Sequence, residues 1–186
     1  HQLAQRIQDE FAVGFVSATE WRGDVAVTVT RDKLHDIAQF LRDEPGMDFD
    51  YMVHVSSVDW PDDEERFEVV WEFYSIRKRH RIRLKTRVPE SDCVVDSLTD
   101  LWKGADFMER EVYDMMGIRF IGHPDLRRIL TDYGFVGHPF RKDFPLSGNV
   151  EMRYDPEQGR VIYQPVTIEP REITPRIIRE DKYGGL

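Results

Sequence analysis

The clearest pattern in the chain is an alternation of apolar and charged positions between residues 67 and 88. In 67–76 one face carries Phe67, Val69, Trp71 and Phe73, while Glu68 and Glu72 share the other. In 79–88 the odd positions are all basic, and apolar residues alternate with them. A period of two is typical of a half-buried strand. The pattern therefore predicts a two-stranded hairpin with one apolar face and one charged face.

Weaker patterns predict the elements that flank this hairpin. Apolar residues at helical spacing indicate helices over 1–13 and from Asp32 to the Pro45-Gly46 stop, and β-branched or apolar runs indicate strands over 24–30 and 51–58. The acidic residues of 59–66 indicate a solvated loop.

A longer helical stretch follows the hairpin, from Asp96 to Met116, and we expect it to break near Gly104. Gly117 is a natural C-cap for it. Its apolar stripe faces the core, and three carboxylates lie off that stripe, at Glu109, Glu111 and Asp114.

From residue 144 onward the chain is punctuated by prolines and shows no helical period. Its apolar residues are too scattered to form a core of their own. We expect a fold of the α/β (α+β) class, with a mostly antiparallel sheet and packed helices in residues 1–146. Residues 147–186 are expected to form an extended arm that clasps a partner.

Composition narrows the class of protein. No apolar run approaches the roughly 18 residues that a membrane-spanning helix needs. The formal charge of −9 argues against broad nucleic-acid binding. Cys93 is the one cysteine, which excludes a disulfide within the chain and a cysteine-ligated iron–sulfur cluster or zinc site.

The basic side of the hairpin is a candidate interface. Two carboxylates cannot neutralise five cations, so we expect an unpaired positive stripe to remain. That stripe is either a surface for a partner or a solvated sheet face, and the residues proposed for the interface are Arg81, Arg83 and Lys85.

Two sets of residues are candidate metal ligands. Glu111 and Asp114 are neighbours on a helix, but Glu109 points away from Glu111 by roughly 200°. That geometry favours separate ion pairs. His123 and His138 could bind a metal with Asp125 and Asp143, although loop histidines more often form hydrogen bonds that hold loops together.

The sequence Gly-His-Pro occurs twice, and a pair of cations follows each copy. Such stretches suit a phosphate site, a metal site with the two histidines, or a docking surface. Arginine suits a docking surface because its guanidinium can bind carboxylates of another chain in a bidentate way. The residues added to the proposed interface are Arg128, His138, Arg141 and Lys142. No phosphate-binding glycine loop and no nucleophile elbow is present in the sequence.

Residues 109–130, EREVYDMMGIRFIGHPDLRRIL, resemble the signature of the thirty-kilodalton subunit family of bacterial NADH–quinone oxidoreductase, respiratory complex I. The resemblance continues through TDYGFVGHPFRKDFPL and is looser elsewhere. The positions that carry the signature are Glu109, Arg110, Glu111, Asp114, His123, Arg127, Ile129 and Leu130.

The resemblance implies a non-catalytic subunit of the peripheral arm, on the cytoplasmic side of the inner membrane or the matrix side in a mitochondrion. It implies no cofactor in this chain, because flavin and iron–sulfur clusters lie in sister subunits that pass electrons from NADH to quinone, coupled to proton translocation. The implied partners are the quinone-site subunit, which the arm clasps, and the neighbouring iron–sulfur subunits.

Two alternatives stay open at this point. One is the equivalent subunit of a related membrane-bound hydrogenase or photosynthetic-type dehydrogenase. The other is a free-standing metal-dependent enzyme that uses His123, His138 and the acidic helix.

Overall fold

The structure is a computed structural model, and it describes residues 2–169. These residues divide into two compact units, with the boundary between Phe144 and Pro145. The first unit contains the helices α1 (Gln2–Glu10), α2 (Leu34–Asp43) and α3 (Ala105–Met116), and the strands β1 (Phe15–Trp21), β2 (Asp24–Val29), β3 (Tyr51–Asp59), β4 (Phe67–Ser75), β5 (His80–Val88), β6 (Val94–Asp96) and β7 (Arg119–Ile121). The second unit contains β8 (Val150–Asp155) and β9 (Arg160–Pro165).

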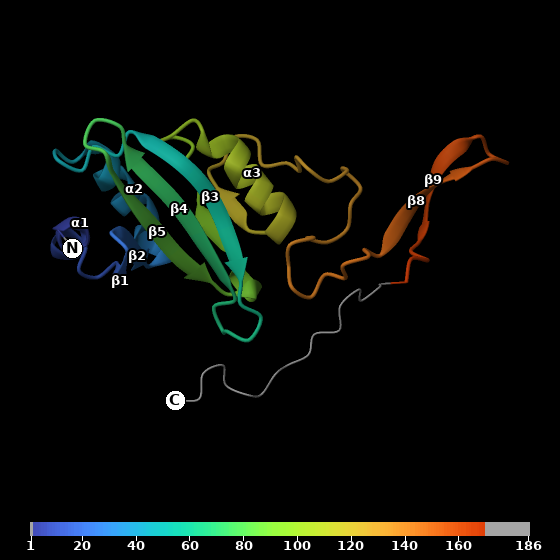
Figure 1. The fold of residues 1–186 in the computed structure, drawn as a ribbon, viewed down its shortest axis with the longest axis horizontal. Coiled ribbons are helices and arrows are strands. Elements are labelled where there is room, and N and C mark those ends of the chain that lie inside the picture. The colour runs from blue at the N-terminus through green and yellow to red at the C-terminus, as the bar shows by residue number, and fades with distance from the viewer. Residues whose placement is uncertain (1, 170–186) are drawn as a thin grey trace, which may run out of the picture. The chain divides into compact units, whose positions relative to one another are not determined.

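Five strands form the main sheet in the order β1-β2-β5-β4-β3, side by side in Figure 1. The β2–β5 pairing is parallel, and the other three pairings are antiparallel. The expected α+β class with a mostly antiparallel sheet is therefore confirmed. No helix of residues 2–169 is long and apolar enough to cross a membrane.

The β4–β5 hairpin matches the predicted alternation closely. Trp71 pairs with Leu84 and Phe73 with Ile82, and all four side chains are buried. All three helices contribute apolar side chains to the same core cluster as these strands. The helices therefore cover the apolar face of the sheet, and the charged face of the hairpin is left open.

The N-terminal hairpin β1–β2 shows what the sequence pattern missed. Strand β1 lies at the edge of the sheet and is exposed along nearly its whole length, so it has no buried face to produce a period of two. Its turn to β2 uses Arg22 and Gly23, with φ of 51° and 88°. Two successive positive φ angles are typical of the tight turns that join antiparallel strands.

The predicted helix over 96–116 is wrong in its first half. Val94–Asp96 forms β6, which pairs in parallel with β7 in a second small sheet. Residues 97–104 form turns, and the helix begins only at Ala105. Gly117, with φ of 81°, ends α3 as a left-handed cap, as predicted.

Candidate functional site

The three carboxylates of α3 lie in different surroundings. Glu109 and Asp114 are fully buried, whereas Glu111 is exposed. Our expectation that all three lie off the buried stripe is therefore wrong for Glu109 and Asp114. Among residues 2–169 no group of three or more His, Cys, Asp or Glu side chains is placed to hold a metal ion. The two buried carboxylates instead bind backbone groups of neighbouring loops.

Glu109 fixes the turn that precedes its own helix. Its carboxylate accepts hydrogen bonds from the Ser97 hydroxyl at 2.6 Å and from the Leu98 N–H at 2.8 Å. The Ser97 hydroxyl also lies 2.9 Å from that of Thr99. Burial raises the pKa of Glu109 to about 7, although these hydrogen bonds favour the charged form.

Asp114 organises the segment that follows Arg127. Its carboxylate accepts hydrogen bonds from the N–H groups of Ile129, Leu130 and Thr131, at 3.0, 2.7 and 2.9 Å, and also from the Thr131 hydroxyl. Arg128 pairs with it at 2.7 Å. Burial alone would raise its pKa, but the hydrogen bonds from Thr131, Leu130 and Arg128 hold the pKa well below its ordinary value.

Two other signature residues, Arg110 and His123, form hydrogen bonds with backbone atoms in or beside the same segment. The Arg110 guanidinium donates to the carbonyl oxygens of Arg127 and Arg128 at 3.2 and 3.3 Å. The His123 ring lies against the Asp106 carbonyl at 3.1 Å, and its Nδ1 accepts the Asp125 N–H at 3.0 Å. His123 and Arg110 therefore serve loop architecture.

The second Gly-His-Pro stretch binds the C-terminal end of α3. His138 Nδ1 lies 3.0 Å from the Asp114 carbonyl oxygen, the Phe140 N–H donates to Met115 at 3.0 Å, and Arg141 Nε donates to Met116 at 2.8 Å. These groups satisfy carbonyls that a helix end leaves without partners. Burial is the main cause that lowers the pKa of His138.

A buried ion pair connects this segment to the sheet. Arg66 forms a bidentate pair with Asp59 at 2.7 and 2.8 Å, and both residues are buried. Asp59 also accepts the Lys142 N–H at 2.7 Å, and Arg66 pairs with Asp143. The prediction of a solvated loop over 59–66 is therefore wrong at its two ends, although the acidic residues between them are exposed.

This polar framework supports an exposed apolar surface. We call residues 122–144 the docking loop. Four of its large apolar side chains are more than half exposed, at Leu130 62%, Tyr133 82%, Val136 84% and Phe140 61%. Large exposed apolar patches mark interaction sites, and these four side chains are candidates for such a patch. The buried charges hold the loop backbone, and the loop presents these four side chains.

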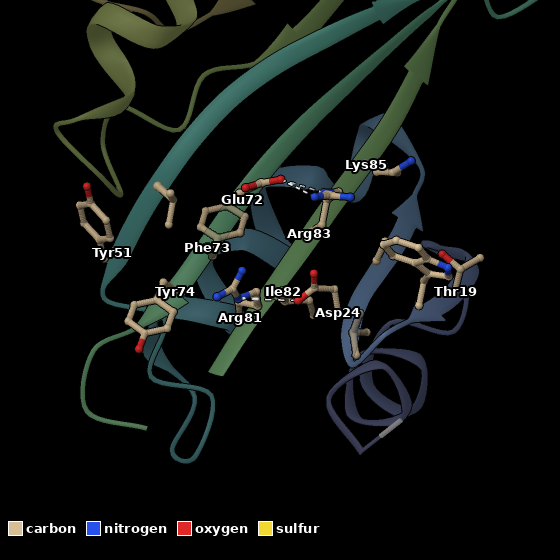
Figure 2. Close-up of a pocket in the computed structure, with 14 residues that line it drawn as sticks. Thr19, Asp24, Tyr51, Glu72, Phe73, Tyr74, Arg81, Ile82, Arg83 and Lys85 are labelled. Atoms are coloured by element: carbon tan, nitrogen blue, oxygen red, sulfur yellow. Dashed lines mark hydrogen bonds and ion pairs between the residues drawn. The ribbon is translucent and has the colours of Figure 1, made fainter. Parts of the chain in front are cut away.

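The open face of the main sheet carries a depression of about 500 Å³, shown in Figure 2. Arg83 pairs there with Glu72, Lys85 with Glu68, and Arg81 with Asp24 at 3.7 Å. Arg87 pairs with Asp63 at 2.7 Å. The prediction of an unpaired stripe is wrong for these four cations, because Asp24 and Asp63 supply the carboxylates that the hairpin lacks.

The site residues thus fall into separate places. Around α3 the structure brings together Glu109, Arg110, Asp114, Arg128, His138 and Arg141. Arg81, Arg83 and Lys85 lie on the open sheet face instead. Sequence reasoning missed Asp59 and Arg66, whose only signal was an acid and a base at opposite ends of a largely acidic loop.

Comparison with known proteins identifies the family. The family model described as "Respiratory-chain NADH dehydrogenase, 30 Kd subunit" matches residues 27–150. An NADH-quinone oxidoreductase subunit of Burkholderia multivorans is 53% identical over 191 aligned residues, covering 99% of this chain and 96% of the relative. The subunit of the same name from Burkholderia vietnamiensis is 51% identical over the same shares.

Solved structures agree with the fold. A trypsin-resistant fragment of Nqo5, residues 1–134 of that protein, is 32% identical with a TM-score of 0.59, and the match covers 68% of this chain and all of the fragment. A chain of an archaeal membrane-bound sulfane sulfur reductase is 24% identical with a TM-score of 0.64, over 78% of this chain and 85% of that chain, and shares the fold. The resemblance of residues 109–130 is thus confirmed. The chain belongs to the 30 kDa subunit family of the respiratory-chain NADH dehydrogenase, the NADH–quinone oxidoreductase known as complex I.

Proposed function

We propose that the chain is a structural subunit of the peripheral arm, on the cytoplasmic side of the membrane, and that the docking loop is its main contact with neighbouring subunits. The family resemblance implies the quinone-site subunit first and then the iron–sulfur subunits. In this proposal the chain holds no cofactor, and its role is to fix the relative positions of the subunits that carry electrons from NADH to quinone.

The proposal rests mainly on what the buried charged side chains of α3 contact. Glu109, Arg110 and Asp114 direct their polar atoms at backbone groups of adjacent loops. Groups committed in this way are poor candidates for acid–base or metal chemistry, which needs polar atoms aimed at an open site. Arg110 and Asp114 hold the backbone of residues 127–131, which carries exposed Leu130.

Supporting evidence comes from the relatives. Those at 53% identity are named as subunits of NADH–quinone oxidoreductase, which favours NADH as the electron donor of the complex over the hydrogenase-type alternative. The proposed contacts through Arg81, Arg83, Lys85 and Lys142 stay a prediction. Because the first three already pair within the chain, a partner there must compete with their internal carboxylates.

The experiment compares two valine substitutions in a tagged full-length chain expressed in place of the native copy. Val136 lies in the docking loop and is 84% exposed, and Val13 lies after α1 and is 89% exposed. Val136→Asp should abolish or strongly reduce recovery of flavin and iron–sulfur subunits after gentle detergent extraction. Val13→Asp should leave it unchanged.

Both variants should melt at the wild-type temperature, because exposed positions contribute little to folding. If Val136→Asp assembles as well as Val13→Asp does, the docking loop is not the contact. If the wild-type chain captures no other subunit, the structural role itself is wrong.

A further inference from the structure

The depression on the open face of the main sheet contains a row of residues that crosses all five strands (Figure 2). Trp21 of β1 pairs with Asp24 of β2. Tyr74 of β4 pairs with Arg81 of β5 and with Tyr51 of β3. An ion pair between Asp24 and Arg81, at 3.7 Å, joins the two halves of this row. Directly paired residues lie on the same face of a sheet, so Arg81 has Trp21 on one side and two tyrosines on the other.

The next row of residues explains why the sheet face is hollow here. Ala26 of β2 lies between Thr19 of β1 and Arg83 of β5. The small Ala26 side chain leaves space between its longer neighbours. The volume of about 500 Å³ lies within the roughly 300–1,000 Å³ that is usual for small-molecule sites. The depression is therefore large enough for a ligand.

The cations of β5 differ in how firmly the chain itself holds them. Arg83 donates to one Glu72 oxygen from both Nε and Nη2, at 3.0 and 2.5 Å. The Arg81 side chain is 68% exposed, and its ion pair with Asp24, which is itself 52% exposed, is longer than that of Arg83. Exposed ion pairs are weak, so an incoming anion can replace Asp24 at little cost. Arg81 is therefore the cation of β5 that this face offers to a ligand.

Arg22 brings a second guanidinium group to the same end of the depression. It lies over the ring of Trp21, 4.4 Å from the ring centroid, and forms no ion pair with another described residue. Trp21 and Arg81 lie two strands apart, which is about 10 Å at the usual spacing between strands. Two guanidinium groups therefore share one exposed carboxylate, that of Asp24, and this end of the depression attracts anions.

Guanidinium groups bind phosphate oxygens in a bidentate way, and aromatic rings stack on planar bases. Tyr51 is half exposed and lies two strands from Arg81, on the side away from Arg22. We propose that the depression binds a nucleoside diphosphate or triphosphate, with its phosphates between the two guanidinium groups and its base against Tyr51 and Tyr74. This site is separate from the docking loop and does not depend on the structural role proposed above.

An acidic segment of a neighbouring subunit fits this face less well than a nucleotide does. Arg83 and Lys85 already pair with glutamates of β4 inside the hairpin. A row of acidic side chains laid along β5 would therefore meet two cations that are already neutralised. A compact anion needs only the end of the depression where Arg22 and Arg81 lie.

The test measures the binding of ADP to the purified full-length chain by equilibrium dialysis. The wild type should bind ADP saturably. Arg81→Gln should weaken this binding by about tenfold or more, because a hydrogen bond to a charged group is lost. The matched control is Arg119→Gln, since Arg119 is also an exposed arginine on a strand but lies in β7, outside the depression. This control should leave the affinity unchanged, and both variants should melt at the wild-type temperature.

Two further probes separate the contribution of the phosphates from that of the base. Inorganic pyrophosphate and adenosine should each bind the wild type more weakly than ADP does. Arg81→Gln should weaken the binding of both ADP and pyrophosphate. Tyr51→Leu should weaken the binding of ADP and leave that of pyrophosphate unchanged.

The absence of saturable ADP binding by the wild type, or equal affinities in Arg81→Gln and Arg119→Gln, would overturn the site. Pyrophosphate that binds as tightly as ADP would overturn recognition of the base, and adenosine that binds as tightly would overturn recognition of the phosphates. If ADP does not bind and Arg81→Gln lowers the yield of assembled complex, the occupant is a neighbouring subunit instead. None of these results changes the test of the docking loop by Val136→Asp.

Discussion

Replacing Asp114 by Asn tests whether the buried carboxylate organises the docking loop. The substitution keeps the shape of the side chain but removes its charge and turns one acceptor into an N–H donor. That donor then faces the N–H groups of Ile129, Leu130 and Thr131 or the Arg128 guanidinium. Arg128 is only 17% exposed in its side chain, so it loses its partner in a poorly hydrated place.

Breaking a buried ion pair from one side costs about 3–5 kcal/mol. Domains are stable by only about 5–15 kcal/mol, so the expected loss is a large fraction of the total. For a chain of this size, about 2–4 °C is lost per kcal/mol. We therefore expect Asp114→Asn to lower the melting temperature by on the order of 10 °C, measured by circular dichroism at pH 7.

The matched control is Glu111→Gln, since Glu111 is an exposed carboxylate of the same helix. It should melt within about 1 °C of the wild type, as surface substitutions usually cost less than about 0.5 kcal/mol. Hydrogen exchange of the amides at 129–131 should accelerate in Asp114→Asn alone. If both variants melt together and those amides stay protected, the role given to Asp114 is wrong.

Lowering the pH should reproduce part of the destabilisation caused by Asp114→Asn, because it protonates the Asp114 carboxylate. The folded pKa of Asp114 lies below its unfolded value near 3.8, so its contribution is complete above that value and is lost as the pH falls towards the folded pKa. Asp114→Asn should therefore be less sensitive to acid below about pH 4 than the wild type is. An identical acid transition in both proteins would contradict the low pKa.

Three further predictions concern other parts of the chain. The folded pKa of Glu109 is raised from 4.5 to about 7, so its contribution is present below about pH 4.5 and is lost as the pH rises to 7. Glu109→Gln should remove that decline in urea denaturation, and a decline of unchanged size would contradict the raised pKa. Gly117→Ala should destabilise the chain by at least about 1–2 kcal/mol, because the positive φ of residue 117 is unfavourable for alanine and the added Cβ would lie 2.6 Å from His138 Nε2. A wild-type melting temperature would refute this reasoning. Trypsin should cut first beyond residue 145 and leave the unit that ends at Phe144 intact, as gel electrophoresis and mass spectrometry would show. Early cleavage within that unit would contradict the boundary.

The sequence was most informative where one face of an element is buried and the other is solvated. The β4–β5 hairpin was predicted from its alternation, because Trp71 and Leu84 face the core and Glu72 and Arg83 face outward. Gly117 was predicted as a cap because glycine readily adopts the left-handed conformation.

Strands without a buried face were harder to predict. Strand β1 is exposed on both faces, so its residues have no period of two. Strand β8 does alternate, but its apolar side chains are exposed and its segment is rich in charges and prolines, so the sequence predicts only an extended arm over 147–186. Residues 170–186 of that predicted arm lie outside the described residues. Short apolar runs such as 94–96 do not distinguish a strand from a helix, and this ambiguity explains the wrong helix start.

The burial of the charged residues could not be predicted from the sequence, for a different reason. Asp59 and Arg66 are separated by exposed residues, four of them acidic, and composition alone predicts a solvated loop for all eight. Glu109 and Asp114 are buried because loop N–H groups and hydroxyls reach them from distant positions in the chain. Such partners depend on tertiary structure, so a local pattern cannot reveal them. The family resemblance marked these positions without indicating what they contact.

The most direct test of the account compares the cofactor content of the isolated chain with that of the complex captured through it. We predict that the purified chain contains no stoichiometric iron, zinc or flavin and does not oxidise NADH. The complex recovered with the same tagged chain should contain flavin and iron–sulfur clusters and should reduce quinone with NADH. Stoichiometric metal or flavin in the isolated chain after gel filtration, or NADH oxidation by it alone, would contradict a purely structural role.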